Sequence, residues 1–439
     1  MKSVDIVIIG SGPGGYATGA EAACDGNSVI IIERDELGGT CLNRGCIPTK
    51  ALCRSAEVAD TVRSAAEFGV DIGCAPVLDF GKAVKRKNEV VSELREGVAQ
   101  TLSETEVIRG EARLKSANEV EVNGETIRAG KIIIATGSAP ASLPIPGAEL
   151  TVNSDQMLSA ETLPSSIIII GGGVIGMEFA SIFASFDVKV TVIEYCKEIL
   201  PPFDVEIAKR LRMSLKRRGI NIITSAEVKS IADGRTVTYE SKGKIKEESA
   251  DMVMMAVGRK PVLPEGLNEL GIKLNRNAIQ VDENMQTSIP GIYAIGDVNG
   301  LCMLAHAASA QGRVALGKRQ RLDVVPSAVF TQPECAMAGL TETQCIDRNL
   351  NIKVGKATFR ANGKALAIGE ADGLVKVIIE ADSHKILGCH ICGAHAADLI
   401  QEMATAMSAN ISADDVAESI HSHPTLGETV HAAVLNALK

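Results

Sequence analysis

The sequence contains no tryptophan, and its few Phe and Tyr residues bring the aromatic content to only 3%. It also contains no run of more than three consecutive basic residues, and its formal net charge is -9. A phosphate backbone would find little electrostatic attraction here, so we expect no nucleic-acid partner. The first apolar run, 4–9, is too short for a signal peptide or a membrane span. We therefore expect a cytoplasmic protein with no membrane association.

Cysteine is sparse. The chain has 11 cysteines in 439 residues, which is too few for a secreted domain held together by disulfides, and the odd number leaves at least one unpaired. Most should be reduced, buried thiols. The length exceeds what one hydrophobic core can serve, and 46% of the residues are hydrophobic. These values predict two to four packed domains.

Two of the cysteines, Cys41 and Cys46, lie in the segment GGTCLNRGCIPTK, residues 38–50. In a regular helix, residues five apart are separated by a rise of about 7.5 Å and point to different faces, beyond the ~7 Å Cα limit for a disulfide. Gly45 adds flexibility and Pro48 interrupts the helical ladder, so we predict a distorted turn at a helix entrance. We interpret the pair as a redox-active disulfide beside a flavin; two buried structural thiols are the alternative.

A nucleotide-binding pattern precedes the cysteine pair. An apolar strand over 5–10 is followed by a loop with GxGxxG spacing and by an alanine-rich helix through Ala23; the loop glycines are Gly10, Gly12 and Gly15. Such glycines let the backbone approach a pyrophosphate at the helix N-terminus. A second strand, 28–32, ends at Glu33, whose carboxylate can accept a ribose hydroxyl. The segment predicts a dinucleotide site.

The same pattern returns near the middle of the chain. A strand over 167–170 precedes a second glycine loop, and a strand over 189–193 ends at Glu194; the glycines here are Gly171, Gly173 and Gly176. Two copies imply two dinucleotides in one chain. A carboxylate at Glu194 would bind a 2′-hydroxyl and repel a 2′-phosphate, which predicts NAD rather than NADP.

The chemistry assigns one cofactor to each loop. A nicotinamide transfers hydride but does not exchange electrons directly with a thiol pair, whereas a flavin can do both. Because the first loop leads to the cysteines, we predict FAD there and NAD at the second loop. The segment TSIPGIYAIGDV delivers Gly296 and Asp297 to the end of another strand. Asp297 could hold the ribityl chain, and a surface turn is the alternative for this pair.

Five segments together resemble the class I pyridine-nucleotide disulfide oxidoreductases: GGTCLNRGCIPTK, IIIATGS, GGGVIGMEFA, AIGDV and HSHPTLGE. The resemblance covers nearly the whole chain. It implies an α/β fold with two Rossmann-like dinucleotide-binding domains and a C-terminal α+β dimerisation domain. The implied limits are 1–146 for the FAD domain with the redox disulfide, 147–259 for the NAD domain, 260–326 for a central segment that returns to the FAD domain, and 327–439 for the interface domain.

The resemblance also implies roles for individual residues. Cys46 faces the flavin as a thiolate, Cys41 exchanges with substrate, and Lys50 beside the flavin pairs with Glu178. The positions carried over for FAD are Gly10, Gly12, Gly14, Gly15, Glu33, Arg34, Gly39, Thr40, Lys50, Ala135, Thr136, Gly137, Gly296, Asp297, Leu304 and Ala305. Those carried over for NAD are Gly171, Gly173, Val174, Ile175, Gly176, Glu194, Val257 and Gly258.

An acid–base pair is expected near the C-terminus, where His423 and Glu428 lie five residues apart. We expect Pro424 in the first turn of a helix that continues through Glu428. Imidazole suits the removal of a proton from a dithiol near pH 7, and a carboxylate fixes its tautomer. The resemblance implies that this pair acts across a homodimer interface on the other subunit's cysteines. His421 and His423 could instead be a metal pair, but further ligands at a recognisable spacing are missing, so we predict no metal site.

Arg44 lies between the two cysteines, where the family commonly has an apolar residue. A guanidinium near either sulfur would favour the thiolate, and a side chain directed at solvent would have no such effect. Both alternatives remain open from the sequence.

The resemblance implies an oxidoreductase that oxidises dihydrolipoyl groups on proteins of 2-oxoacid dehydrogenase or glycine cleavage complexes and reduces NAD. One alternative is another NAD(P)H-dependent disulfide reductase of the superfamily, acting on glutathione, another low-molecular-weight disulfide or mercuric ion. A second alternative is a binding subunit of such a complex, with redox activity secondary.

Overall fold

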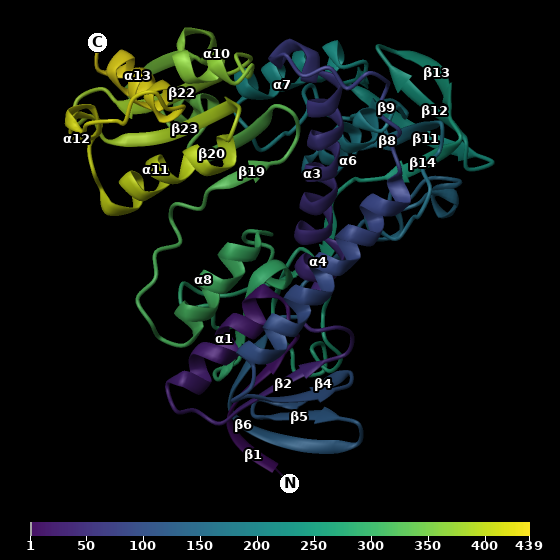
Figure 1. The fold of residues 1–439 in the computed structure, drawn as a ribbon. Helices are drawn as coiled ribbons and strands as arrows, with labels where there is room; N and C mark the ends of the chain where they lie inside the picture. Colours follow the sequence, from purple (N-terminus) through teal and green to yellow (C-terminus); the bar gives the residue numbers. More distant parts are fainter. Residues whose placement is uncertain (1) are drawn as a thin grey trace.

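The structure is a computed structural model that describes residues 2–439. Its N-terminal part, at the bottom of Figure 1, is built on a mixed sheet in the order β3-β2-β1-β6-β5-β4, with β18 also paired to β6. The strands are β1 (Lys2–Ile9), β2 (Val29–Glu33), β3 (Glu106–Arg109), β4 (Ala112–Ser116), β5 (Glu119–Val122), β6 (Glu125–Ile134) and β18 (Ile292–Ala294). The β2, β1, β6 and β18 strands run parallel and are rich in buried Ile and Val, as expected for strands covered on both faces.

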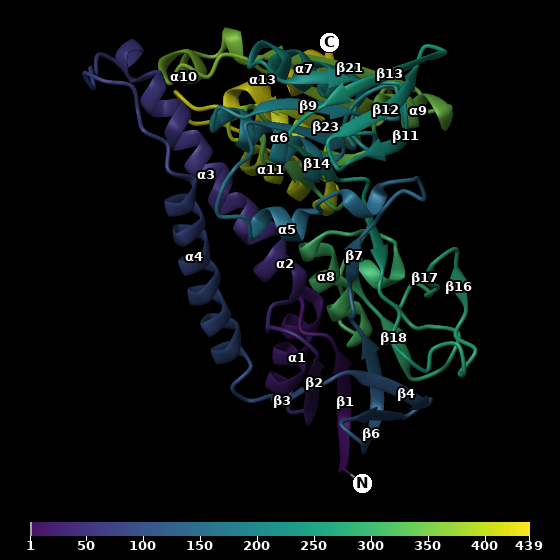
Figure 2. The same ribbon diagram turned by 90° about the vertical axis from the view of Figure 1, so that its right-hand side faces the viewer.

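Helices cover this sheet and lead away from it. α1 (Pro13–Cys24) packs against α8 (Ala305–Ala315), and the short α2 (Gly39–Arg44) is followed at once by α3 (Cys46–Arg63). α3 packs against α4 (Phe80–Thr101), and a 3-10 turn, η1 (Ala65–Phe68), lies between them in the chain. α4 runs from the lower part of the molecule toward the upper part, and α3 extends from the middle to the top (Figures 1 and 2).

The second glycine loop belongs to a separate parallel sheet in the order β10-β9-β8-β14. Its strands are β8 (Ser166–Ile170), β9 (Lys189–Ile193), β10 (Asn221–Ile223) and β14 (Met252–Met255), and the helices of this part are α5 (Ser154–Leu158), α6 (Val174–Ser185) and α7 (Val205–Arg217). An antiparallel sheet follows, formed by β11 (Ala226–Ala232), β12 (Thr236–Ser241) and β13 (Lys244–Ser249).

The segment that leads into this second part and the segment that leads out of it lie side by side. β7 (Ser138–Pro140) and β15 (Arg259–Pro261) pair antiparallel. The returning segment contains the small hairpin β16 (Leu274–Asn275) and β17 (Ala278–Ile279), then β18, and then the 3-10 turn η3 (Gly296–Asn299). β18, a strand of the first sheet, therefore comes from the chain segment that follows the second part in the sequence.

The C-terminal part is an antiparallel sheet in the order β19-β20-β23-β22-β21 with helices packed against it. Its strands are β19 (Ser327–Val329), β20 (Glu334–Gly339), β21 (Ile352–Thr358), β22 (Leu374–Glu380) and β23 (Ile386–Gly393). Its helices are α9 (Glu342–Asp347), the 3-10 turn η4 (Phe359–Ala361), α10 (Gly363–Ala367), α11 (Ala396–Ala409), α12 (Ala413–Glu418) and α13 (Gly427–Leu438). α13 packs on β21 and β22, and α11 on β20 and β23.

This arrangement confirms the predicted α/β fold class. One local prediction is wrong: α13 begins at Gly427, so Pro424 lies outside the helix, and the His423–Pro424 peptide is cis. Within residues 2–439, no helix combines the length and the apolar character that crossing a membrane requires.

Candidate flavin and disulfide site

The two cysteines lie on either side of a break between helices. Cys41 is in α2, and Cys46 is the first residue of α3. Gly45 separates them with φ -147 and ψ -110, and a Cβ at this position would lie 3.0 Å from the carbonyl oxygen of Thr40. A glycine therefore lets the two helices meet closely. The predicted bend is present, and both cysteines are half-buried free thiols.

The two thiols do not titrate alike. A hydrogen bond from Cys41, aided by the charge of Lys50, lowers the pKa of Cys46 to about 7 although burial opposes it. The same hydrogen bond, together with burial, raises the pKa of Cys41. A thiolate is the reactive form of cysteine. The pair therefore holds its negative charge on Cys46 near neutral pH.

Lys50 lies one turn after Cys46 on α3 and forms an ion pair with Glu178 of α6. Its Nζ donates to both carboxylate oxygens, at 2.9 and 3.0 Å. The Glu178 side chain is 4% exposed and that of Lys50 31%. The backbone N–H of Phe330 also donates to Glu178, at 3.0 Å, and the Phe330 ring centroid lies 4.6 Å from Lys50 Nζ. The structure thus brings the predicted pair together and adds Phe330, which no local sequence signal indicated.

The first glycine loop is shaped to admit a phosphate. A Cβ at Gly15 would lie 1.9 Å from the carbonyl oxygen of Gly10, so the turn closes on itself there. Gly12 is the N-cap of α1, and a Cβ on it would have no neighbour within 4 Å. Among residues 2–439, no side chain caps this helix start. Free N–H groups at a helix N-terminus facing open space are the usual receptor for a pyrophosphate, so the residues present fit a dinucleotide such as FAD.

The second loop repeats this geometry. A Cβ at Gly176 would lie 2.0 Å from the carbonyl oxygen of Gly171, and Gly173 is an uncapped N-cap of α6 facing open space. Glu194 at the end of β9 is 6% exposed. Val257 and Gly258 follow β14 after one intervening residue, Ala256, and the carboxyl end of β14 borders the same loop because β14 is paired with β8. The NAD set predicted from the sequence therefore gathers at one sheet edge.

A cavity of about 470 Å³ joins most of the residues predicted for FAD. Its wall contains Gly10, Gly12, Gly14, Glu33, Arg34, Gly39, Thr40, Ala135, Thr136, Gly137, Gly296, Asp297, Leu304 and Ala305, together with both cysteines, Lys50 and Glu178. Val174 and Ile175, predicted for NAD, also line it. Gly15 does not, because it packs beneath the loop. The thiol pair and the first nucleotide loop thus face one space.

Two polar residues that contact one another behind Asp297, Ser138 and Arg259, were not predicted from the sequence. Ser138 donates to the Asp297 carboxylate at 2.5 Å and in turn accepts from Arg259 Nε at 2.7 Å. All three line the cavity. Ser138 belonged to the IIIATGS segment and could have been noticed there. Arg259 lies 121 residues later, and only the β7–β15 pairing brings it close.

His423 and Glu428 meet as expected. His423 Nδ1 lies 2.9 Å from Glu428 Oε1, while Glu428 Oε2 accepts from the N–H of Thr425 at 2.9 Å. The hydrogen bond from Thr425 and then that from His423 lower the pKa of Glu428. The His423 side chain is 78% exposed, so its other ring nitrogen is open to a partner or substrate.

The structure bears on two alternatives that the sequence left open, the direction of the Arg44 side chain and a metal pair formed by His421 and His423. Arg44 forms an ion pair with Asp35, so its guanidinium is directed at a carboxylate rather than at the sulfurs. His421 lies 2.8 Å from Glu402 and stacks on His431 with ring centroids 4.3 Å apart. It therefore does not point with His423 at a common centre.

Two dinucleotide loops, a thiol pair at one of them and an exposed histidine–carboxylate pair define a two-nucleotide disulfide flavoprotein. The comparison with family models agrees. Residues 4–312 match the model described as "Pyridine nucleotide-disulphide oxidoreductase", and residues 325–434 match its dimerisation domain. The chain belongs to the pyridine nucleotide-disulphide oxidoreductase family. This membership confirms the predicted class of enzyme and its cofactors, FAD and NAD, and the dimerisation domain supports a homodimer.

Similar proteins cover essentially the whole chain. A dihydrolipoyl dehydrogenase of Geobacillus stearothermophilus is 39% identical over 99% of this chain and 96% of its own length. That of Thermus scotoductus is 41% identical over 98% and 96%. Among solved structures, the HOCl-induced flavoprotein disulfide reductase RclA from Escherichia coli superposes with a TM-score of 0.86 at 30% identity, covering 98% of this chain and 99% of that one.

Proposed function

We propose that this chain is a dihydrolipoyl dehydrogenase, which oxidises protein-bound dihydrolipoyl groups and reduces NAD. The observation that carries the proposal is the thiol pair in the wall of the first nucleotide cavity, with the pKa of Cys46 lowered to about 7. The relatives that are about 40% identical over nearly their whole length support the choice of substrate.

The chemistry begins with the cysteine pair as a disulfide. His423 accepts a proton from one substrate thiol, and the resulting thiolate attacks Cys41 Sγ, so that Cys46 leaves as a thiolate. The second substrate thiol then attacks the substrate sulfur of this mixed disulfide, and its proton passes to Cys41. The lipoyl disulfide closes, Cys41 is released as a thiol, and two electrons remain on the cysteine pair. FAD bound in the cavity supplies the route by which these electrons leave as hydride on NAD.

The residues of this chain prepare each step. Glu428 orients His423 through Nδ1 and stabilises its protonated form. Lys50 holds positive charge next to Cys46, which favours the thiolate. The carboxylates of Glu33 and Glu194 are assigned to the ribose hydroxyls of FAD and NAD, and Asp297 to the ribityl chain. The other residues proposed to bind FAD and NAD are those that the family resemblance implies and that are named above for each cofactor.

The domain limits are proposed as 1–146, 147–259, 260–326 and 327–439, which the separate sheets and the β7–β15 crossing support. We further propose that His423 acts on the cysteines of the partner subunit, because its exposed ring lies in the segment matched by the dimerisation domain. The physiological partners would be lipoyl-bearing proteins of 2-oxoacid dehydrogenase or glycine cleavage complexes, and the site of action the cytoplasm.

A disulfide reductase that runs from NAD(P)H toward a small disulfide is the second candidate, favoured by the similarity to RclA. One assay separates the two. The purified protein is given dihydrolipoamide with NAD, and in parallel NADH or NADPH with lipoamide, glutathione disulfide and mercuric ion. We expect rapid dihydrolipoamide oxidation with NAD. Turnover confined to another disulfide or to mercuric ion would reject the proposal.

A further inference from the structure

The Lys50–Glu178 ion pair is covered by a short strap, Phe330–Gln332, which follows β19. The N–H of Phe330 donates to Glu178 at 3.0 Å, and its ring lies against the ammonium group of Lys50. The strap therefore contacts both charged groups. Since the charge of Lys50 also lowers the pKa of Cys46, the strap lies against the group that favours the Cys46 thiolate.

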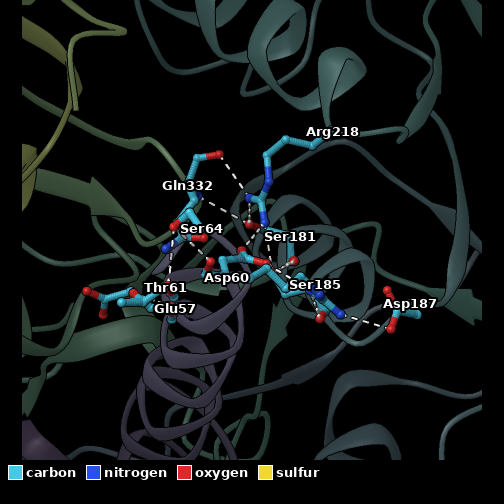
Figure 3. A network of polar contacts seen from close by, with 10 residues as sticks. Glu57, Asp60, Thr61, Ser64, Ser181, Ser185, Asp187, Arg218 and Gln332 are labelled. Atoms are coloured by element: carbon cyan, nitrogen blue, oxygen red, sulfur yellow. Dashed lines mark hydrogen bonds and ion pairs between the residues drawn. The ribbon is translucent and has the colours of Figure 1, made fainter. Parts of the chain in front are cut away.

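The far end of the strap is anchored by Arg218, the residue directly after α7 (Figure 3). Arg218 Nη1 donates to the carbonyl oxygen of Gln332 at 3.1 Å and to Ser181 Oγ at 3.1 Å. The N–H of Gln332 donates to the same Ser181 Oγ at 3.2 Å. Ser181 lies one turn after Glu178 on α6. The strap is thus fixed to one face of α6 at both ends.

Arg218 also joins α6 to α3. Its Nη2 donates to Asp60 Oδ2 at 2.5 Å and to Ser185 Oγ at 2.8 Å, and Ser185 donates to Asp60 at 2.7 Å. Asp60 lies ten residues after Lys50 on α3, which is about 15 Å along the helix. Arg63 of α3 contributes at the same level, because its Nη1 donates to Asp60 at 3.0 Å and to the carbonyl oxygen of Ser185 at 2.6 Å. The two helices are therefore tied at two levels, once by Lys50–Glu178 and once by the cluster that Arg218 and Arg63 form around Asp60.

The cluster is partly shielded from water. The side chains of Arg218 and Asp60 are only 24% and 28% exposed, and burial lowers the pKa of the guanidinium while Asp60 opposes that effect. Charged groups in such surroundings are held in one geometry, because losing a partner leaves a charge with little solvation. Arg218, Asp60 and Gln332 are absent from the cavity wall. Any influence on the redox pair must pass through the strap and the helix contact.

We propose that Arg218 is a positioning residue for the redox site: it anchors the strap and fixes α3 against α6 so that Lys50 stays between Glu178 and Cys46. The effect on turnover rests on the proposed function, whereas the effect on the Cys46 thiol applies to any reaction of this site.

The test compares Arg218→Met with a matched control, Arg212→Met. Arg212 is on α7, is 25% exposed, and donates to Glu198 at 2.7 and 3.0 Å without touching α3 or the strap. Thiol pKa values are measured from the pH dependence of alkylation of the reduced protein. Trypsin cuts at Arg34, Arg44 and Lys50 and so isolates Cys41 and Cys46 in separate peptides, which mass spectrometry can follow individually.

With Arg218→Met, Lys50 is no longer confined near the sulfur, so we expect the pKa of Cys46 to rise by about half a unit or more. We also expect kcat with dihydrolipoamide to fall about 3- to 10-fold at little-changed KM. Arg212→Met should leave both values as in the wild type. Because Arg218→Met risks misfolding, Ser181→Ala is a second variant: it removes the oxygen shared by Arg218 and the strap without burying a charge, and its effects should have the same direction.

An unchanged Cys46 titration in folded Arg218→Met and Ser181→Ala would overturn the proposal, even if both proteins unfold more easily. An equal shift in Arg212→Met would also overturn it. A wild-type protein that fails to oxidise dihydrolipoamide would reject the proposed function instead, and the alkylation comparison would remain decisive for Arg218.

Discussion

Glu194 accepts a hydrogen bond from the backbone N–H of Gly172 at 2.5 Å, just as Glu33 accepts one from Ser11 at 2.7 Å in the first nucleotide unit. Each carboxylate also accepts from the N–H two residues further on, that of Cys196 or Asp35. The two acids therefore brace their glycine loops.

Replacing Glu194 with Arg should move cofactor preference from NAD toward NADP. The change removes the charge that repels a 2′-phosphate and adds one that attracts it, so we expect the ratio of kcat/KM values to shift by at least about tenfold, which is about 1.4 kcal/mol. Steady-state rates with both cofactors measure this. Glu194→Gln removes the negative charge, and its single amide oxygen can keep only one of the two loop hydrogen bonds; it should weaken discrimination without reversing it. Unchanged preference in Glu194→Arg would contradict the assignment.

The Cys46 thiolate should be visible in the spectrum of the two-electron-reduced holoenzyme. Because the pKa of Cys46 is lowered to about 7, a long-wavelength thiolate-to-flavin absorbance should be full above neutral pH and fade as the pH falls through about 7. Lys50→Met removes the nearby positive charge, so its midpoint should lie higher. A band that does not respond to pH, or one equally strong in a Cys46→Ser variant, would argue against this sulfur as the donor.

His423→Gln should reduce dihydrolipoamide oxidation by about 10²- to 10⁴-fold, since that is the usual contribution of a general base. FAD content should not change. The chain offers a matched control in His384, whose Nδ1 lies 2.9 Å from Asp414 in the same kind of histidine–carboxylate pair. His384→Gln should retain nearly full turnover. Near-normal kcat in His423→Gln would exclude it as the base.

Much of the site was predictable because its chemistry is local in sequence. The glycine loops, the bend at Gly45 and the His423–Glu428 pair each lie within a few residues. Phe330, Arg259 and Arg218 were not predictable, since each acts on a group more than 100 residues away and only the strand and helix packing brings them together. Pro424 was misassigned because its position suited a helix start, whereas α13 begins three residues later at Gly427.

A further prediction concerns stability and involves a histidine outside the active site. His390 in β23 is fully buried, its Nε2 lies 2.9 Å from the carbonyl oxygen of Leu340, and its Nδ1 has no hydrogen-bond partner among residues 2–439. Burial lowers the pKa of His390; the hydrogen bond to Leu340 and the nearby Asp204 oppose that shift, and Lys376 adds to it. The folded protein therefore keeps the ring neutral at a pH where the unfolded chain takes up a proton.

The unfolded state binds more protons below about pH 6.5, so the free energy of unfolding should fall as the pH drops below that value, by up to about 1.4 kcal/mol per pH unit from this group. Urea unfolding between about pH 7.5 and about pH 5 measures the slope of the free energy of unfolding against pH. These limits lie on the order of one unit either side of the usual histidine pKa. His390→Asn should be less stable at neutral pH because it disturbs the core. Its free energy of unfolding should nevertheless change less steeply with pH, by the equivalent of up to one bound proton. His395→Asn, at an exposed histidine, should keep the wild-type slope. Parallel curves for wild type and His390→Asn would mean that His390 does not contribute to acid sensitivity.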